Sequence, residues 1–229
     1  MAGETWLMND LSRHIDHTIL KPDATAKDIE MLCAEAHEHH FHSVCINSSR
    51  VALAKHLLED SEVKICTVVG FPLGAMDGDA KRFETEVAID NGADEIDMVM
   101  NIGLLKDGQH AAVTRDIRDV IDAADDRIVK VILETCLLSD EQIITACKLA
   151  VEAQAHFVKT STGFSTGGAL LNHVKLMRTT IGNAAGVKAS GGIRDTATAL
   201  AMIAAGATRL GTSNSVAIIT GTVPATGNY

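Results

Sequence analysis

Short runs rich in β-branched residues alternate with longer amphipathic segments along this chain, and the alternation repeats eight times. The runs predict strands at 15–20, 43–47, 64–70, 95–101, 129–135, 157–161, 186–190 and 209–213. The segments between them predict helices at 26–40, 77–91, 107–124, 140–154, 168–181 and 195–205. This pattern is typical of right-handed βαβ units around a parallel sheet. Eight units in 229 residues favour a closed (β/α)8 TIM barrel over an open doubly wound sheet.

The chain is expected to form one domain over residues 1–229. It has no proline-rich linker, low-complexity tract or break in composition, and 46% of its residues are apolar, which is enough for a large core. Asp77, Ser139 and Asp195 stand where three of the predicted helices begin, as N-cap residues do. The last residues, TVPATGNY, carry no strand or helix pattern, so we expect a short, mobile C-terminal tail.

Charge and cysteine content narrow the class of protein. The formal charge of −10 argues against a surface that binds nucleic acid, so an anionic substrate would have to be held by a local site. The five cysteines include no C-x-x-C pair, which is typical of reduced thiols. The N-terminus lacks a signal-peptide pattern, and no apolar run reaches 18 residues. These features predict a cytoplasmic protein that does not enter a membrane.

Side-chain alternation along each strand predicts which residues point into the barrel. If the apolar residues face the surrounding helices, the interior receives charged side chains from several strands. They are three acids and three bases, namely Asp16, Asp97, Glu134, Lys130, Lys159 and Lys188. A purely structural interior would carry Val, Ile and Leu, because buried charge is costly unless the signs are matched. The interior therefore indicates a functional site, with a structural salt-bridge network as the less favoured alternative.

Two of these lysines are expected at the C-terminal mouth of the barrel, where active sites of this fold lie. Lys159 and Lys188 precede the glycines at 163 and 191 and belong to consecutive units. Adjacent strands place two such residues about 4.8 Å apart. Two ammonium groups this close disfavour each other's charged form, which favours one neutral amine, the form that a Schiff-base nucleophile needs. Asp97 can supply an acid–base group beside them.

Glycine-rich turns follow the last three predicted strands and read TSTGFSTGGA, SGGIRD and GTSNS. Their backbone N–H groups and hydroxyls suit a phosphate, and loops at this end of a TIM barrel form its usual phosphate site. The histidine-rich stretch HEHHFH, at 37–42, leads into the opposite end of the barrel. We therefore predict no metal site there.

The chain resembles the deoxyribose-phosphate aldolases nearly end to end. The blocks that carry the resemblance are IDHTIL, VCIN, VVGFPLGA, EIDMVMNIG, KVILET, FVKTSTGFSTGGA, VKASGGIRD and RLGTS. The resemblance implies a cytosolic class I aldolase of the (β/α)8 fold that uses no metal and no cofactor. Such an enzyme reversibly cleaves 2-deoxy-D-ribose 5-phosphate to D-glyceraldehyde 3-phosphate and acetaldehyde. It also implies a homodimer.

The resemblance carries roles onto residues of this chain. It implies that Lys159 forms the Schiff base, that Lys188 is the second lysine and that Asp97 donates and accepts protons. The expected substrate-binding residues are Asp16, Thr18, Cys45, Lys130 and Thr162. The expected phosphate-binding residues are Gly163, Gly191, Gly192, Gly211 and Ser213. Asn214 and Asp195 depart from the usual pattern, and Tyr229 stands where some relatives carry a tyrosine that reaches the site.

Three alternatives stay open at this point. The chain could be another Schiff-base aldolase, or a sugar-phosphate isomerase on the same barrel. From a different class, it could be a sugar-phosphate-binding barrel without catalytic activity. The combination of two lysines and an acid favours iminium chemistry over an isomerase or a barrel without catalytic activity, and it does not separate one Schiff-base aldolase from another.

Overall fold

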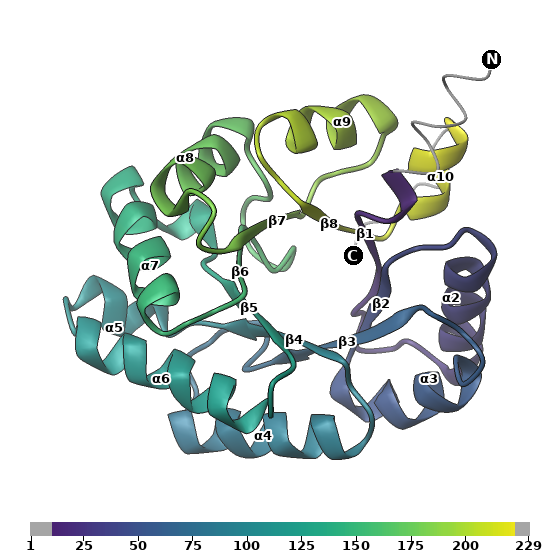
Figure 1. The fold of residues 1–229 in the computed structure, drawn as a ribbon, viewed down its shortest axis with the longest axis horizontal. Helices are drawn as coiled ribbons and strands as arrows, with labels where there is room; N and C mark the ends of the chain where they lie inside the picture. Colours follow the sequence, from purple (N-terminus) through teal and green to yellow (C-terminus); the bar gives the residue numbers. More distant parts are fainter. Residues whose placement is uncertain (1–10, 223–229) are drawn as a thin grey trace.

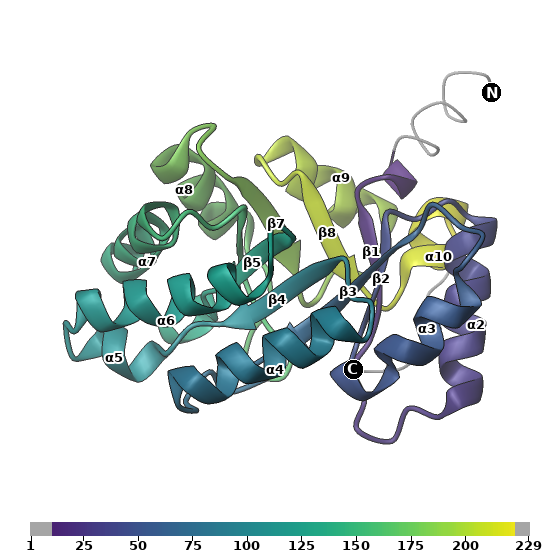
Figure 2. The same ribbon diagram turned by 60° about the horizontal axis from the view of Figure 1, so that its bottom comes forward.

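Eight parallel strands close into a barrel in the order β1 to β8, and helices surround it (Figures 1 and 2). The computed structural model describes residues 11–222. The strands are β1 Ile15–Ile19, β2 Ser43–Ile46, β3 Lys64–Val69, β4 Glu95–Val99, β5 Ile128–Ile132, β6 Phe157–Lys159, β7 Gly186–Ser190 and β8 Arg209–Thr212. The predicted TIM barrel is confirmed. The expected C-terminal tail, with Tyr229, lies outside the described residues.

Within residues 11–222 the structure contains three helices that were not predicted from the sequence. In chain order, the helices are α2 Ala26–Glu38, α3 Val51–Leu57, α4 Gly78–Asp90, α5 Ile102–Lys106, α6 His110–Ala123, α7 Asp140–Glu152, α8 Leu171–Ile181, α9 Thr196–Ala204 and α10 Ser215–Thr220. Helices α3, α5 and α10 were not predicted, because segments of seven residues or fewer show too little periodicity. The three predicted N-caps are confirmed by hydrogen bonds from the first turn to Asp77, Ser139 and Asp195.

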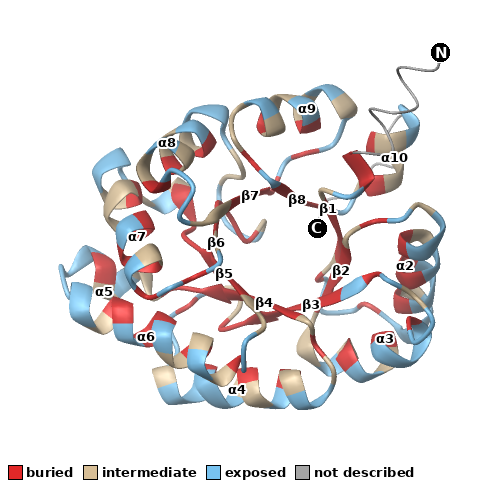
Figure 3. Ribbon diagram, in the orientation of Figure 1, coloured by how far each residue is buried: buried red, intermediate tan, exposed pale blue. Residues whose placement is uncertain are grey.

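The strands follow the predicted inside–outside alternation. Their outward apolar residues, such as Met98, Val131 and Val187, pack with the helices in one continuous core. Figure 3 shows the strand ring as buried and the helices as buried only on their inner sides. Leu20, Cys45, Cys66 and Val68 form a separate apolar cluster, and Cys45 pairs in register with Cys66 on β3. The outer core holds the barrel closed and leaves its interior free for polar side chains.

The register sets charged residues opposite one another on neighbouring strands. Asp97 on β4 pairs with Lys130 on β5, and Lys159 on β6 pairs with Lys188 on β7. Lys188 is also level with Arg209 on β8. Because adjacent parallel strands lie only about 4.8 Å apart, these side chains meet inside the barrel.

Candidate active site

A connected network of charged side chains fills the barrel interior. Within residues 11–222 its members are Asp16, Glu95, Asp97, Lys130, Lys159, Lys188 and Arg209. None of them is more than 5% exposed. Charges this deeply buried are stable only when paired and hydrogen-bonded, so each contact in the network matters.

Asp97 is the centre of the network. Its Oδ1 accepts a hydrogen bond from Lys130 Nζ at 2.8 Å. Its Oδ2 accepts from both Lys159 Nζ and Lys188 Nζ, each at 2.7 Å. Burial alone would raise the pKa of Asp97, but the three ammonium groups outweigh it and hold that pKa well below the ordinary value. The predicted meeting of Lys159, Lys188 and Asp97 is therefore confirmed as geometry.

Lys188 is held between two carboxylates. It donates to Asp97 and to Asp16, whose other oxygen accepts from Arg209 Nη1 at 2.9 Å. Burial would lower the pKa of Lys188, but the charges of Asp16 and Asp97 raise it above the ordinary value. Lys188 is thus held as an ammonium ion.

Glu95 and Arg209 complete the network, and neither was predicted from the sequence. Glu95 Oε2 lies 2.6 Å from Lys130 Nζ and 3.1 Å from Arg209 Nη1. Burial would raise the pKa of Glu95, but Lys130, the hydrogen bond with His42 and Arg209 lower it to about 2. The signal was present, because alternation puts Glu95 on the same side of its strand as Asp97. Arg209 likewise shares its side with Gly211.

Glu134 was predicted to point into the barrel with the other charged residues, but within the described residues it forms no ion pair with a lysine. It follows β5 in the left-handed region, with φ at 54°, and this turn takes its side chain out of the strand alternation. Its carboxylate accepts hydrogen bonds from the hydroxyl and the backbone N–H of Thr162. The Thr162 hydroxyl in turn accepts from Phe164 N at 3.0 Å. Glu134 therefore orders the turn after β6 instead of neutralising a lysine.

The remaining expected substrate contacts lie on the walls of the interior. Thr18 is buried and donates its hydroxyl to the backbone oxygen of Asp16 at 2.8 Å. Cys45 is buried beside Cys66, and a hydrogen bond between the two thiols lowers the pKa of Cys45. Cys66 in turn donates to Asp97 Oδ1, with 3.1 Å between sulfur and oxygen.

The glycine-rich turns come together at the mouth. Gly163, Gly191 and Gly192 all have positive φ, between 80° and 86°, which L side chains rarely adopt. A Cβ on Gly191 would lie 3.0 Å from Gly168 Cα, so the turns after β6 and β7 pack backbone against backbone. Gly211 leaves room for Lys188, whose Cε would lie 3.0 Å from a Cβ there. Ser213 is exposed just after β8.

Asp195 is directed away from this cradle. Its carboxylate caps α9 by accepting from Thr198 N at 2.8 Å and from the Thr198 hydroxyl at 3.0 Å. Asn214, the other departure from the usual pattern, donates its backbone N–H to the Thr212 hydroxyl.

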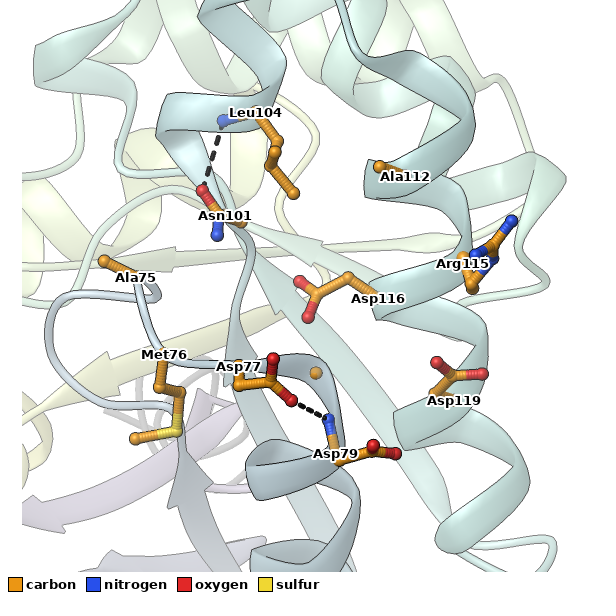
Figure 4. Close-up of a pocket in the computed structure, with 11 residues that line it drawn as sticks. Ala75, Met76, Asp77, Asp79, Asn101, Leu104, Ala112, Arg115, Asp116 and Asp119 are labelled. Atoms are coloured by element: carbon orange, nitrogen blue, oxygen red, sulfur yellow. Dashed lines mark hydrogen bonds between the residues drawn. The ribbon is translucent and has the colours of Figure 1, made fainter.

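A separate cavity of about 640 Å³ lies outside the barrel, between α4, α5 and α6 (Figure 4). Four of its lining residues are acidic, namely Asp77, Asp79, Asp116 and Asp119. Figure 4 shows Asp116 turned towards Asn101, whereas Arg115 points the other way. Such a surface would repel a phosphate ester, so the barrel interior is the better candidate site.

Two clusters of potential metal-ligand atoms occur within the described residues, and both lie in the interior network. They are Cys45 with Cys66 and Asp97, and Asp16 with Cys66 and Glu95. Lys130 Nζ reaches a carboxylate in each cluster, so an ammonium group already occupies the position of a cation.

No helix in the described part of the chain has the length and apolar character needed to cross a membrane.

Comparisons with known proteins show the family of the chain. Residues 12–223 match the family described as DeoC/LacD family aldolase. The deoxyribose-phosphate aldolase of Alkaliphilus oremlandii is 57% identical over 96% of this chain and all of its own length. That of Bdellovibrio bacteriovorus is 59% identical over 92% of this chain and 96% of its own.

Solved structures give the same result. The tetrameric deoxyribose phosphate aldolase of Aeropyrum pernix superposes with a TM-score of 0.88 and 32% identity. The superposition covers 95% of this chain and 94% of that one. Family, relatives and fold agree over nearly the whole sequence, and the chain therefore belongs to the DeoC/LacD family of aldolases.

Proposed function

We propose that this aldolase reversibly cleaves 2-deoxy-D-ribose 5-phosphate to D-glyceraldehyde 3-phosphate and acetaldehyde through a Schiff base on Lys159. The observation that carries the proposal is the pairing of Lys159 with Lys188 in register, both bonded to one oxygen of Asp97. Relatives at 57–59% identity that carry the name deoxyribose-phosphate aldolase support the choice of substrate.

Lys159 is the best nucleophile among the interior lysines. Lys130 and Lys188 are fully buried, and each contacts at least two carboxylates. Lys159 pairs only with Asp97 and is 3% exposed, at the end of β6 towards the mouth. It is therefore the lysine that a substrate entering from the mouth meets first.

The proposed reaction moves protons among the same three residues. The neutral Lys159 amine attacks the C1 aldehyde of the open-chain sugar, and proton transfer through Asp97 and Lys188 expels water to give an iminium ion. Deprotonation of the C3 hydroxyl then breaks the C2–C3 bond, and the electron pair moves into the iminium group to form an enamine. Glyceraldehyde 3-phosphate leaves, the enamine is protonated at C2, and water releases acetaldehyde and the free amine.

The substrate phosphate would bind at the glycine turns after β6, β7 and β8. Their backbone N–H groups provide a local positive potential in a protein whose formal charge is −10. The Asp195 carboxylate already occupies the N-terminus of α9, so that helix end is not open to a second anion. The phosphate would therefore be held by the turns themselves, around Gly191 and Gly192.

We further propose that the enzyme acts in the cytoplasm as a homodimer. The absence of a membrane-crossing helix in the described residues fits this location. The Aeropyrum pernix relative is described as a tetramer, so sedimentation of the full chain would decide between a dimer and a larger assembly.

A turnover assay tests the proposed reaction. The protein should release acetaldehyde and glyceraldehyde 3-phosphate from 2-deoxyribose 5-phosphate in equal amounts, with no loss of rate in EDTA. 2-Deoxyribose without phosphate is the matched control, and it should react more slowly because the glycine turns have nothing to bind. No cleavage would favour a binding barrel, and isomerisation without cleavage would favour an isomerase.

A further inference from the structure

Glu95 and Arg209 belong to the interior network, but within residues 11–222 they form no ion pair with Lys159, Lys188 or Asp97. Glu95 precedes Asp97 by two residues on β4, and Arg209 is the register partner of Lys188. They contact each other, and within the described residues their ion pairs reach the proposed catalytic residues through Lys130, which contacts Asp97, and through Asp16, which contacts Lys188. Any effect they have on the reaction is therefore indirect.

The network has an odd charge balance. Within residues 11–222 it joins three carboxylates, of Asp16, Glu95 and Asp97, to four bases, of Lys130, Lys159, Lys188 and Arg209. If all were ionised, one positive charge in a closed interior would have no counter-charge. Because burying an unmatched charge is strongly unfavourable, one base has to give up its proton.

The identity of that base follows from the contacts. Arg209 bonds to both Asp16 and Glu95, and a guanidinium group does not deprotonate in proteins. Lys130 lies within 2.8 Å of both Glu95 and Asp97, and Lys188 contacts both Asp16 and Asp97. Only Lys159 has a single carboxylate, which it shares with two other ammonium groups.

We propose that Glu95 and Arg209 are positioning residues that set the charge balance of the interior and thereby the protonation of the Lys159 amine. Arg209 favours the neutral amine, and Glu95 limits the excess of positive charge that drives its deprotonation. Arg209 pairs with carboxylates that would otherwise be available to a lysine. Glu95 in turn neutralises the positive charge of Lys130. The proposal rests on the proposed role of Lys159 as nucleophile. It adds that the second lysine alone does not determine the protonation of the first.

Other titratable groups near the network do not change this balance. The Cys66 thiol donates to Asp97, and burial raises its pKa. Cys45 forms a hydrogen bond with Cys66, so the two thiols share a proton with each other and not with a base of the network. Glu134 bonds to Thr162 and not to a base of the network. His42 Nε2 lies 3.2 Å from Glu95 Oε1, and the His42 side chain is 32% exposed, so solvent weakens this contact.

Charge-removing variants of the two residues should act in opposite directions. Arg209→Met leaves three carboxylates facing three lysines, so Lys159 gains a proton more readily. The acid limb of the kcat/KM profile should then move to higher pH, by about one unit. Glu95→Gln leaves two carboxylates facing four bases, so the same limb should move to lower pH. The double variant removes one charge of each sign and should return the limb towards its original position.

A conservative variant separates charge from shape. Arg209→Lys keeps the positive charge while it loses the planar fork, so its acid limb should stay close to that of the parent enzyme. Circular dichroism of every variant checks that the barrel is folded. If Arg209→Met does not fold, Glu95→Gln and Arg209→Lys still test the direction and the charge dependence.

The decisive readout is the pH dependence of trapping by acetaldehyde with cyanoborohydride, followed by mass spectrometry of the Lys159 peptide. Opposite shifts in Glu95→Gln and Arg209→Met, with recovery in the double variant, would establish the proposal. Shifts in the same direction, or no shift in either, would overturn it. If the label falls on a lysine other than Lys159 in the parent enzyme, the proposed function fails first, so the two failures are distinguishable.

Discussion

Two buried sets of ionised side chains within residues 11–222 differ in how the charges are shared. Lys81 on α4 and Asp116 on α6 form a closed pair beside the acidic cavity, with 2.7 Å between nitrogen and oxygen. Lys81 also donates to the backbone oxygen of Val99 at 3.0 Å. In the barrel interior, by contrast, Asp97 alone is shared among three lysines.

The pKa directions follow this difference. Burial lowers the pKa of Lys81 and raises that of Asp116, and their single contact does not outweigh it. In the interior, burial would also lower the pKa of Lys130 and Lys188, but several carboxylates outweigh it and raise both. Burial by itself therefore does not make a lysine reactive. Under the proposed charge balance, a reactive amine arises where bases outnumber the carboxylates that could hold them charged.

Removing Lys159 should have the largest effect on activity. Lys159→Leu deletes the proposed nucleophile but leaves Asp97 paired with Lys130 and Lys188, so the barrel should remain folded. We expect turnover to fall at least about 1,000-fold, because no other interior lysine is placed to form the Schiff base. The retro-aldol assay together with thermal unfolding measures both outcomes. Retention of more than a tenth of the activity would contradict the assignment.

Removing Lys81 should affect stability and leave catalysis alone. Lys81→Met strands the buried Asp116 carboxylate, which should cost about 3–5 kcal/mol of unfolding free energy. The folded fraction should keep kcat within a factor of two, because Lys81 lies outside the barrel. Urea unfolding and steady-state kinetics test the two halves of this prediction. The double variant Lys81→Met/Asp116→Leu should recover much of the lost stability, and a failure to recover would mean that the pair itself is not the cause.

Acid should weaken the interior network by a smaller amount. The folded-state pKa values of Asp16, Glu95 and Asp97 are all lowered, that of Glu95 to about 2. The unfolded chain therefore binds more protons than the folded one below about pH 5, and stability falls as the pH drops from about 5 to 3. Glu95 alone should account for about 2 kcal/mol of this loss. Urea midpoints at the two pH values measure it, and an unchanged midpoint would contradict it.

Much of the fold and the centre of the site could be predicted from the sequence because both depend on simple periodicity. The eightfold alternation predicted the barrel, and the two-residue repeat within strands predicted that Lys159, Lys188 and Asp97 point inward. The glycines at 163, 191 and 192 have the positive φ values that such turns require.

The parts that were missed depend on local geometry or on contacts distant in sequence. The left-handed turn at Glu134 ends the alternation, so its side chain bonds to Thr162 and no lysine. Arg209 and Glu95 are 114 residues apart, and only closure of the barrel brings them together. A full application of the alternation rule to both strands would have placed them inside, though it would not have identified their partners.

The most direct test of the central claim is the identity of the lysine trapped by acetaldehyde and borohydride at neutral pH. Three buried lysines lie in the barrel interior. Lys81 is buried outside the barrel and serves as the internal control. Peptide mapping should find a two-carbon adduct on Lys159 and none on Lys81, Lys130 or Lys188. An adduct on Lys188, or an equal distribution over the buried lysines, would contradict the claim that the network leaves Lys159 as the neutral amine.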